Sequence, residues 1–441
     1  MSTKTDSRRN FLKESAFLTS VAGLTTLGVH AQEPNSAPVP LKIGLVGCGG
    51  RGRGAIVNAL SADPNTKFVA AGDAFHSNAE GAVNALKKDP KWGERIDVTP
   101  ETIFDGLECY KQVIDLCDVV LLCEPPHFRP MTLRYAVEKG KHVFCEKPVA
   151  VDGTGIKSVL ESAKLAQEKK LNLVSGLCWR YDLNVQNMVN QLLDGAIGDI
   201  LSIRETFLTS RLWTRAKQEG DTEMMFQVRN WYNFAWLSGD FNTEQHIHSL
   251  DKALWLFGGE VPTTAYGLGG RMARTDQPAY GDIYDEMSVV YEYEDGRTIY
   301  SLSRQQNRCF NETEDHVLGT NGRASVLKGE IVWKKAHKVP KVPSDMYQLE
   351  HNELFKAIRS GGEKYINDGT YMANSTMLAI LGRLACYTGK RLTWDEALDM
   401  ELPTKPSGYT WNDTPPTLPD ENGRYKVEVP GEGLVYHQVG R

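Results

Sequence analysis

The chain of 441 residues is long enough for two domains, and the 41% of residues that are hydrophobic can form a substantial core. Its formal net charge of -6 and the lack of a basic stripe argue against a nucleic-acid-binding protein. Beyond the first 31 residues, no apolar run is long enough to cross a bilayer. We therefore expect a globular protein without nucleic acid or a membrane span among its partners.

The first 31 residues have the features of a targeting segment. Ser7–Lys13 matches the twin-arginine pattern, a mildly apolar stretch follows, and Ala31 ends an A-x-A-like cleavage site. Residues 32–40 contain three prolines and are expected to form a linker. This pattern predicts a periplasmic protein that is exported, already folded, by the twin-arginine route. The alternative is a basic, disordered tail.

The eight cysteines are scattered singly, without a C-x-x-C pair or metal-ligand spacing. Most are expected to be small buried residues, and no metal is expected. A disulfide stays open as a possibility for an exported protein, because the sequence does not pair the cysteines.

Residues 41–177 alternate predicted strands with predicted helices. Strands are expected at 41–46, 68–73, 119–123, 142–145 and 171–175, and helices at 55–60, 78–88, 109–116, 130–139 and 155–169. This alternation predicts an α/β fold with a doubly wound parallel sheet, the Rossmann arrangement that binds dinucleotides.

A glycine turn joins the first strand of this domain to the first helix. Gly47, Gly49 and Gly52 occupy the G-x-G-x-x-G positions, and the second strand ends at Asp73, about 20 residues further on. Gly47 would permit the tight turn, Gly49 the approach of a pyrophosphate, and Gly52 close helix packing. Asp73 is placed to accept hydrogen bonds from ribose hydroxyls and to repel a 2′-phosphate. The cofactor is therefore expected to be NAD, with NADP less favoured.

Further cofactor-binding residues are expected beside this turn and at the strand ends, where open α/β sheets bind their ligands. They are Cys48, Gly50, Arg51, Glu124, Pro125, His127, Glu146, Lys147 and Arg180. Lys147 follows a predicted strand and precedes a proline, which would direct its ammonium toward the nicotinamide. There it could donate a hydrogen bond to the substrate oxygen or stabilise its negative charge. The alternative is a solvated surface lysine.

Residues 178–400 show longer predicted strands with few helices between them. Strands are expected at 199–208, 263–268, 287–293, 298–303, 324–327 and 331–333, and helices at 185–193, 243–256, 346–359 and 372–387. This pattern predicts an α+β domain with an open, mostly antiparallel sheet, one face of which would form a homo-oligomer. Residues 401–441, rich in proline, glycine, asparagine and aspartate, are expected to form an extended arm.

In this second domain a histidine and two carboxylates are spaced as residues on one face of a helix are. If residues 243–256 form a helix, Glu244, His248 and Asp251 lie on one face. A histidine held by a carboxylate is a proton carrier suited to neutral pH. Glu244 is therefore expected to orient His248 as a catalytic acid or base. A metal pair without a third ligand and a helix with satisfied polar side chains are the alternatives.

These features together resemble the Gfo/Idh/MocA family of NAD(P)-dependent oxidoreductases over about residues 41–400. The matching motifs are Gly47-x-Gly49-x-x-Gly52, Asp73, Glu146-Lys147-Pro148 and His248-x-x-Asp251. The resemblance implies a nucleotide domain followed by an α/β domain with an open sheet, and catalytic roles for Lys147 and His248. It also places an aromatic or basic residue near the nicotinamide, where this chain has Arg180. The family usually has aspartate where this chain has Glu244.

The substrate is expected to be a sugar, glycoside or polyol, because rings and amides alternate over residues 229–234, although ordinary loop packing would explain them equally well. The expected substrate-binding residues are Lys147, Tyr181, Trp231, Tyr232, Glu244 and His248. The expected reaction is hydride transfer from a hydroxyl-bearing carbon to an NAD that stays bound and is recycled. Two alternatives stay open: an NAD-dependent glycoside hydrolase or lyase that works through transient oxidation, similar to α-N-acetylgalactosaminidases, and a non-catalytic sugar- or nucleotide-binding protein.

Overall fold

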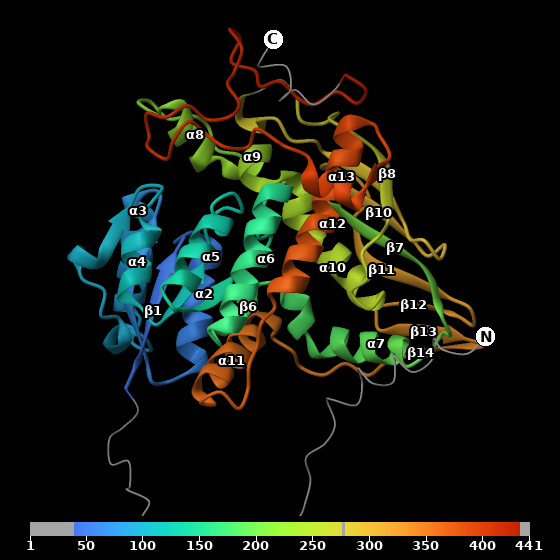
Figure 1. Ribbon diagram of the computed structural model, residues 1–441, viewed down its shortest axis with the longest axis horizontal. Helices are drawn as coiled ribbons and strands as arrows, with labels where there is room; N and C mark the ends of the chain where they lie inside the picture. Colours follow the sequence, from blue (N-terminus) through green and yellow to red (C-terminus); the bar gives the residue numbers. More distant parts are fainter. Residues whose placement is uncertain (1–38, 276–277, 433–441) are drawn as a thin grey trace, which may run out of the picture. The chain divides into compact units, whose positions relative to one another are not determined.

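The structure, a computed structural model, describes residues 39–275 and 278–432 (Figure 1). The predicted targeting segment, the linker up to residue 38 and the last nine residues of the predicted arm lie outside the described residues. Within the described ranges, none of the helices combines the length and the apolar character needed to cross a bilayer.

A six-stranded parallel sheet forms the nucleotide-binding half. Its strands are β1 (Leu41–Val46), β2 (Thr66–Asp73), β3 (Ile103–Asp105), β4 (Val119–Leu122), β5 (His142–Cys145) and β6 (Leu173–Ser175), in the order β3-β2-β1-β4-β5-β6. Most residues of the strands are apolar and buried, as is typical of a parallel sheet with helices on both faces. The strand order changes direction between β1 and β4, and their carboxyl ends therefore flank the crevice where such sheets bind ligands.

Helices from both halves of the sequence cover this sheet. They are α2 (Gly50–Ala62), α3 (His76–Lys88), α4 (Tyr110–Leu116), α5 (Arg129–Glu138), α6 (Gly153–Glu168) and α11 (Met346–Arg359). The last of these returns from the second half of the chain and packs against α2, so that Leu354 and Phe355 join the core around Ile43, Leu45 and Phe68.

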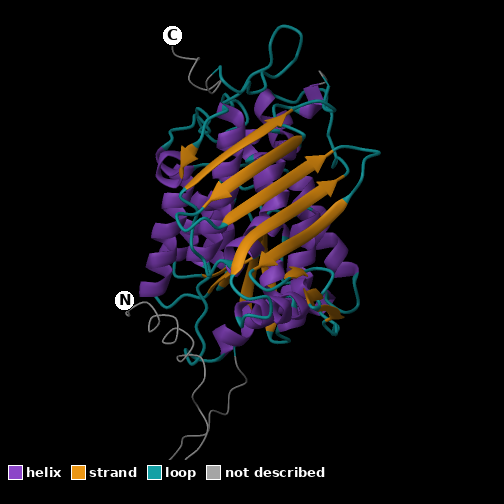
Figure 2. Cartoon of the chain, turned by 90° about the vertical axis from the view of Figure 1, so that its right-hand side faces the viewer, coloured by secondary structure: helices purple, strands orange, loops and turns teal. Residues whose placement is uncertain are grey.

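A nine-stranded, mostly antiparallel sheet forms the second half, and Figure 2 shows it with helices behind it. Its strands are β7 (Ile200–Thr209), β8 (Thr264–Gly270), β9 (Glu286–Glu292), β10 (Thr298–Gln305), β11 (Glu312–Gly319), β12 (Arg323–Ser325), β13 (Glu330–Trp333), β14 (Lys335–Lys338) and β15 (Leu392–Thr393), in the order β14-β13-β12-β11-β7-β10-β9-β8-β15. Among these neighbours β7 and β10 run parallel. The expected α/β fold with a second, open sheet is confirmed.

Strand β11 was not expected from the sequence. It begins with Glu312-Thr313-Glu314-Asp315-His316, and acidic residues are depleted in strands. The structure nevertheless pairs it with β7 along its whole length. The antiparallel partner and the packing of alternate side chains decide its conformation, rather than the local propensity.

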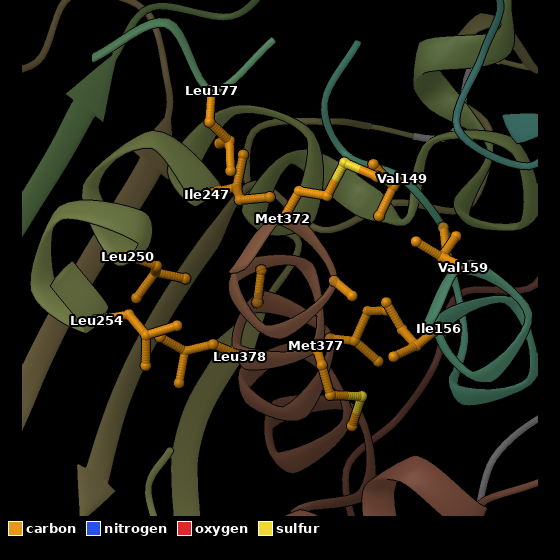
Figure 3. Close-up of a cluster of buried hydrophobic side chains, with 14 of the residues drawn as sticks. Val149, Ile156, Val159, Leu177, Ile247, Leu250, Leu254, Met372, Met377 and Leu378 are labelled. Atoms are coloured by element: carbon orange, nitrogen blue, oxygen red, sulfur yellow. The ribbon is translucent and has the colours of Figure 1, made fainter. Parts of the chain in front are cut away.

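Helix α12 (Gly369–Thr388) joins the two halves. The remaining helices of the second half are α7 (Leu183–Leu193), α8 (Glu223–Arg229), α9 (Ala235–Ser238), α10 (Ile247–Leu256) and α13 (Trp394–Asp399). Figure 3 shows Met372, Met377 and Leu378 of α12 between the side chains of α10 and those of α6. The apolar core is therefore continuous from α6 to α10, and it fixes the position of α10 relative to the first sheet.

Candidate active site

The glycine turn after β1 has the geometry expected of a dinucleotide site. Gly47 has φ +87°, and a Cβ there would lie 2.5 Å from the backbone of Cys123 and Glu124. A Cβ on Gly52 would lie 1.9 Å from the carbonyl oxygen of Gly47, whereas nothing lies within 4 Å of one on Gly49. The fold itself therefore requires glycine at positions 47 and 52, while the open space at Gly49 is available to a ligand.

The helix that follows presents its amides toward this turn. Helix α2 begins at Gly50, and its N-cap residue, Gly49, has no side chain that could bond to the first-turn N–H groups. Such free amides, with the positive end of the helix dipole, attract phosphate groups.

Asp73, at the end of the neighbouring strand β2, forms a hydrogen bond with the glycine turn. Its Oδ2 accepts the Cys48 N–H at 2.7 Å, and its Oδ1 accepts the Phe75 N–H and the Asn78 side-chain amide, each at 3.0 Å. An ionised carboxylate offers about four lone pairs, so these bonds leave capacity for the ribose contact that the sequence predicts.

A cavity of about 670 Å³ opens above the turn, a volume within the usual range for small-molecule sites. Its lining includes the glycine turn, Asp73 and Glu124. The Thr132 hydroxyl donates to Oε1 of Glu124 at 2.5 Å. The other carboxylate oxygen of Glu124, Oε2, is buried and has no hydrogen-bond partner among the described residues. Burial raises the pKa of Glu124. The free amides, the open glycine and the unpartnered oxygen fit a dinucleotide, which offers phosphates and hydroxyl donors.

Lys147 and Glu244 form an ion pair at the same edge of the sheet. Lys147 follows β5, and a cis peptide bond joins it to Pro148. The neighbouring strand β4 leads into Cys123 and Glu124, which line the cavity, whereas Lys147, Glu244 and His248 are not part of that lining. Its Nζ donates to Oε1 of Glu244 at 2.8 Å and to the Glu244 backbone oxygen at 2.6 Å. The two side chains are 11% and 9% exposed, respectively. The structure therefore brings together two of the three predicted catalytic residues.

His248 lies close enough to Lys147 for their charges to interact. Burial, followed by the positive charges of Lys147, Lys252 and Arg51, moves the pKa of His248 well below its usual value. Its Nδ1 is buried and has no hydrogen-bond partner among the described residues. The imidazole is therefore neutral at physiological pH and able to accept a proton.

The structure corrects the predicted role of Glu244 as the partner of His248. Residues Asn242–His246 form a π-helical turn before α10 begins at Ile247. In a π-helix the hydrogen bonds run from i to i+5, so residues four apart no longer lie directly above one another. Glu244 consequently binds Lys147 and the side-chain amide of Gln245.

Arg51, which lines the cavity, forms a partly buried network with Glu146. The Arg51 guanidinium pairs with Glu146 and, at 2.6 Å, with Glu350 of α11. The Lys147 N–H donates to Oε2 of Glu146 at 3.1 Å. Since Arg51 also lines the cavity, this network connects the glycine turn with the strand end that carries Lys147.

Arg180 and Tyr181 are bound to other carboxylates and do not line the cavity. Nε and Nη2 of Arg180 contact the Asp251 carboxylate at 2.9 to 3.1 Å, and the Tyr181 hydroxyl donates to Asp368 at 2.7 Å. Asp251, predicted to share the face of His248, is held by Arg180 and by Ser375 at 2.7 Å. All of these residues belong to the second domain, residues 178–400. Because the bonds occupy the polar groups of both side chains, the structure supports a structural role for Arg180 and Tyr181.

His127 and Tyr232 also lie outside the cavity lining. His127 contacts Trp236 and the Tyr409 hydroxyl, 3.1 Å from its Nε2, and burial lowers its pKa to about 4. Tyr232 is 1% exposed and accepts a hydrogen bond from the Gln305 amide at 2.7 Å. Of the predicted aromatic pair, Trp231 does line the cavity. A sequence of adjacent aromatic residues does not show which ring faces inward.

Several cavity-lining residues were missed in the sequence, among them Phe75, Asn78, Trp213, Arg215, Gln218 and Arg229. The segment from Thr209 to Glu223 connects β7 with α8 and exceeds the common connection length of about 4–6 residues. Long connections frequently cover binding sites, and this length was the signal available in the sequence.

The glycine turn, the cavity and the ionisable residues beside it define a two-domain enzyme of the NAD-binding oxidoreductase class. Residues 41–174 match the oxidoreductase family with an NAD-binding Rossmann fold (GFO/IDH/MocA), and residues 185–325 match the GFO/IDH/MocA C-terminal domain. The two matches together span more than half of the chain, which therefore belongs to this family.

Individual relatives are distant. The chain is 28% identical over 244 residues to 2,7-anhydro-N-acetylneuraminate hydratase of Escherichia coli (strain K12), covering 54% of this chain and 59% of that protein. It is 25% identical over 273 residues to inositol 2-dehydrogenase of Rhizobium meliloti (strain 1021), covering 62% and 71%. A crystal structure of a putative myo-inositol dehydrogenase from Sinorhizobium meliloti 1021 shares the fold, with a TM-score of 0.56, 21% identity, and coverage of 80% of this chain and 99% of that chain.

Proposed function

We propose that the protein oxidises a hydroxyl group of a sugar, glycoside or polyol with NAD as the hydride acceptor. The observation that carries this proposal is the arrangement of Lys147, Glu244 and a neutral His248 after β5, the strand that pairs with β4. The residues that follow β4, Cys123 and Glu124, line the cavity. The similarity to inositol 2-dehydrogenase supports a polyhydroxylated substrate.

Each residue has a separate role in this reaction. When bound, NAD supplies the hydride acceptor. His248 accepts the hydroxyl proton, because its lowered pKa leaves the imidazole unprotonated. The Lys147 ammonium exchanges its bond to Glu244 for one to the substrate oxygen and stabilises the negative charge on it. Glu244 keeps Lys147 in place before the substrate arrives.

A second candidate is a reaction without net oxidation, in which the cofactor is reduced and reoxidised within one cycle. The similarity to 2,7-anhydro-N-acetylneuraminate hydratase favours this candidate. Transient oxidation of a hydroxyl acidifies the neighbouring C–H, so that a base can remove its proton and the substituent one carbon further on can leave. A glycosidic or anhydro bond would be cleaved in this way.

Purified protein and a panel of polyols, glycosides and anhydro sugars distinguish the two candidates. Continuous growth of the absorbance of reduced nicotinamide with added NAD supports net oxidation. Cleaved product without lasting absorbance supports the redox-neutral reaction. A protein that turns over no compound of the panel and binds no NAD would contradict both.

Replacing His248 by asparagine tests the proposed base. We expect the rate to fall by about 10²–10⁴-fold, with NAD binding unchanged. Since the pKa of His248 is lowered, the parent should keep its kcat/KM as the pH falls through the usual histidine range. His246→Asn is the matched control, because His246 lies on the same segment but bonds to Ser301 at 2.6 Å. An acid limb at the ordinary histidine pKa would contradict the assignment.

We also propose a homo-oligomer that forms through the outer face of the second sheet. Tyr266 and Tyr300 both lie opposite Val290 on this face and, like Leu318 of β11, are exposed. Light scattering of purified protein measures the oligomeric state, and Tyr300→Glu should yield monomers if this face is the interface. A monomeric parent would contradict it.

Periplasmic export by the twin-arginine route remains a further proposal, supported by the motif at Ser7–Lys13. Replacing Arg8 and Arg9 by lysine should retain the protein in the cytoplasm, as cell fractionation would show. Unchanged periplasmic protein would contradict the proposed route.

A further inference from the structure

The cavity above the glycine turn has a second wall that does not belong to the nucleotide-binding sheet. Trp213, Arg215, Gln218, Arg229 and Trp231 all line it, and all come from the connection between β7 and α9. We call residues 211–231 the covering segment. It faces Asp73, Phe75 and Asn78, the residues at the ribose side of the expected nucleotide site.

Three distant parts of the chain meet at the ring of Phe75, two residues after Asp73. The indole of Trp411 stacks on it with centroids 5.2 Å apart and planes at 22°. The Arg229 guanidinium lies 4.2 Å from the centroid of the same ring. Phe75 and Arg229 line the cavity, and Trp411 packs on Phe75 from outside that lining. Phe75 therefore joins the nucleotide domain, the covering segment and the C-terminal arm.

The arm is fastened to the covering segment by hydrogen bonds. The Thr222 hydroxyl donates to the backbone oxygen of Trp411 at 2.5 Å, and the Gln227 amide donates to that of Thr417 at 2.8 Å. Asp221 holds Arg229 through two bonds of 2.9 and 3.2 Å. Because the backbone of the arm is bound at several points, Trp411 has a defined position although residues 401–432 contain no helix or strand.

The covering segment also brings an uncompensated positive charge to the cavity. Arg215 is exposed and its guanidinium lies 5.4 Å from the ring of Trp213. Among the described residues no carboxylate lies within ion-pair distance of it, whereas Arg51 and Arg229 are both paired. A pyrophosphate carries two negative charges, which Arg215 and the amides of α2 could bind from opposite domains.

We propose that the covering segment and Trp411 form the outer wall of the site for the adenosine diphosphate half of NAD and slow its release. This inference rests on the proposed function only in taking NAD as the cofactor. Arg215 binds the pyrophosphate, and the stack of Trp411 on Phe75 keeps the wall closed at the adenosine end. A bound cofactor that leaves slowly suits a reaction in which NAD is recycled within the site.

Release of NADH tests the role of Trp411, since its fluorescence changes when excess NAD displaces it. Loss of an aromatic stack costs about 0.5–1.5 kcal/mol, so we expect Trp411→Ala to release NADH more than twofold and up to about tenfold faster. Trp411→Phe should restore slow release. Trp333→Ala, an exposed tryptophan on β13 away from the cavity, is the matched control. Release from Trp411→Ala within twofold of the parent rate would overturn the proposed wall.

Titration with ADP and adenosine tests Arg215. Arg215→Gln should weaken ADP binding about tenfold and reduce its salt dependence, while adenosine binding stays unchanged, because adenosine has no phosphate. Arg204→Gln, an exposed arginine on β7 that does not line the cavity, is the control. Equal losses for ADP and adenosine would overturn the pyrophosphate contact. Both experiments measure binding and not activity. A protein that binds NAD but oxidises no compound of the panel would therefore contradict the proposed function and leave this inference intact.

Discussion

Lys147 and Lys252 both lower the pKa of His248 and both pair with a carboxylate, yet their surroundings differ. Lys147 and Glu244 lie at the sheet edge beside the cavity and are 11% and 9% exposed. Lys252 of α10 and Asp315 of β11 are 1% and 0% exposed, with 3.2 Å between Nζ and Oδ1. Lys252 also donates to the backbone oxygen of His248 at 2.9 Å.

A second carboxylate, that of Glu205, lies beside the buried Lys252–Asp315 pair, which we call the sealed pair. Glu205 of β7 lies directly opposite Asp315 of β11 in the sheet register. Burial, and then the charge of Asp315, raises the pKa of Glu205 well above its usual value. With Glu205 protonated, the three groups are neutral as a set, which suits a water-free interior. One lysine–carboxylate pair is therefore enclosed in the interior, while the other is partly exposed, as its proposed role in catalysis requires.

Lys147→Met should have the largest effect on activity. Removing a group that stabilises charge on a reacting oxygen lowers kcat by about 10²–10³-fold. The melting temperature and the NAD content should stay close to the parent values, because the pair lies at the edge of the core. Steady-state kinetics and calorimetry measure both. A variant with full kcat would show that Lys147 serves the structure alone, as Lys252 does.

Lys252→Met should reduce stability instead. Breaking a buried ion pair costs about 3–5 kcal/mol, because Asp315 is left without its counter-ion. Urea unfolding measures this loss, and adding Asp315→Asn should recover most of it. If the single variant unfolds like the parent, the sealed pair contributes little to stability and the contrast with Lys147 fails.

Glu244→Gln should have a smaller effect than loss of Lys147 itself. Glutamine keeps an oxygen for the Lys147 ammonium but removes the charge, so we expect about a tenfold fall in kcat, the size of one charge-assisted hydrogen bond. Glu244→Asp is the informative companion, since aspartate is the usual residue of the family here. Loss of NAD binding in either variant would show that the pair shapes the nucleotide site as well.

Glu205→Gln should have the smallest effect and one that depends on pH. Because the folded-state pKa of Glu205 is raised, the parent loses stability as the pH rises from the ordinary carboxyl pKa through the folded-state value. Glutamine does not titrate, so the variant should show a flatter dependence and gain on the parent at alkaline pH. Melting temperatures across a pH series measure this. Parallel curves would mean that Glu205 is ionised in the folded protein.

Much of the nucleotide domain could be predicted because its signals are local. The positive φ of Gly47 and the Cβ clash at Gly52 are properties of a short turn, and the spacing of the glycines already indicates them. Five of the six parallel strands were found as mostly apolar runs, whereas the short strand β3 was not predicted. By contrast β11, with its acidic start, has no local strand signal, and its pairing with β7 depends on residues more than a hundred positions away.

The site shows the same division. Lys147 follows directly from a strand end, whereas the partner of Glu244 depends on a π-helical turn that helical spacing does not reveal. Arg180 and Tyr181 follow the last strand of the first domain, and this place in the sequence suggested a contact with the nicotinamide. In the structure they bind Asp251 and Asp368, which are distant in the chain.

The sequence by itself determined the dinucleotide turn and the order of the two domains, and it indicated Lys147 and His248 as candidate catalytic residues, because these depend on short-range spacing and on residue chemistry. The tertiary structure decided which charges meet. It paired Glu244 with Lys147, sealed Lys252 among carboxylates of β7 and β11, and brought Trp411 onto Phe75. Contacts between residues far apart in the chain arise from the packing of whole elements, and no local pattern encodes them.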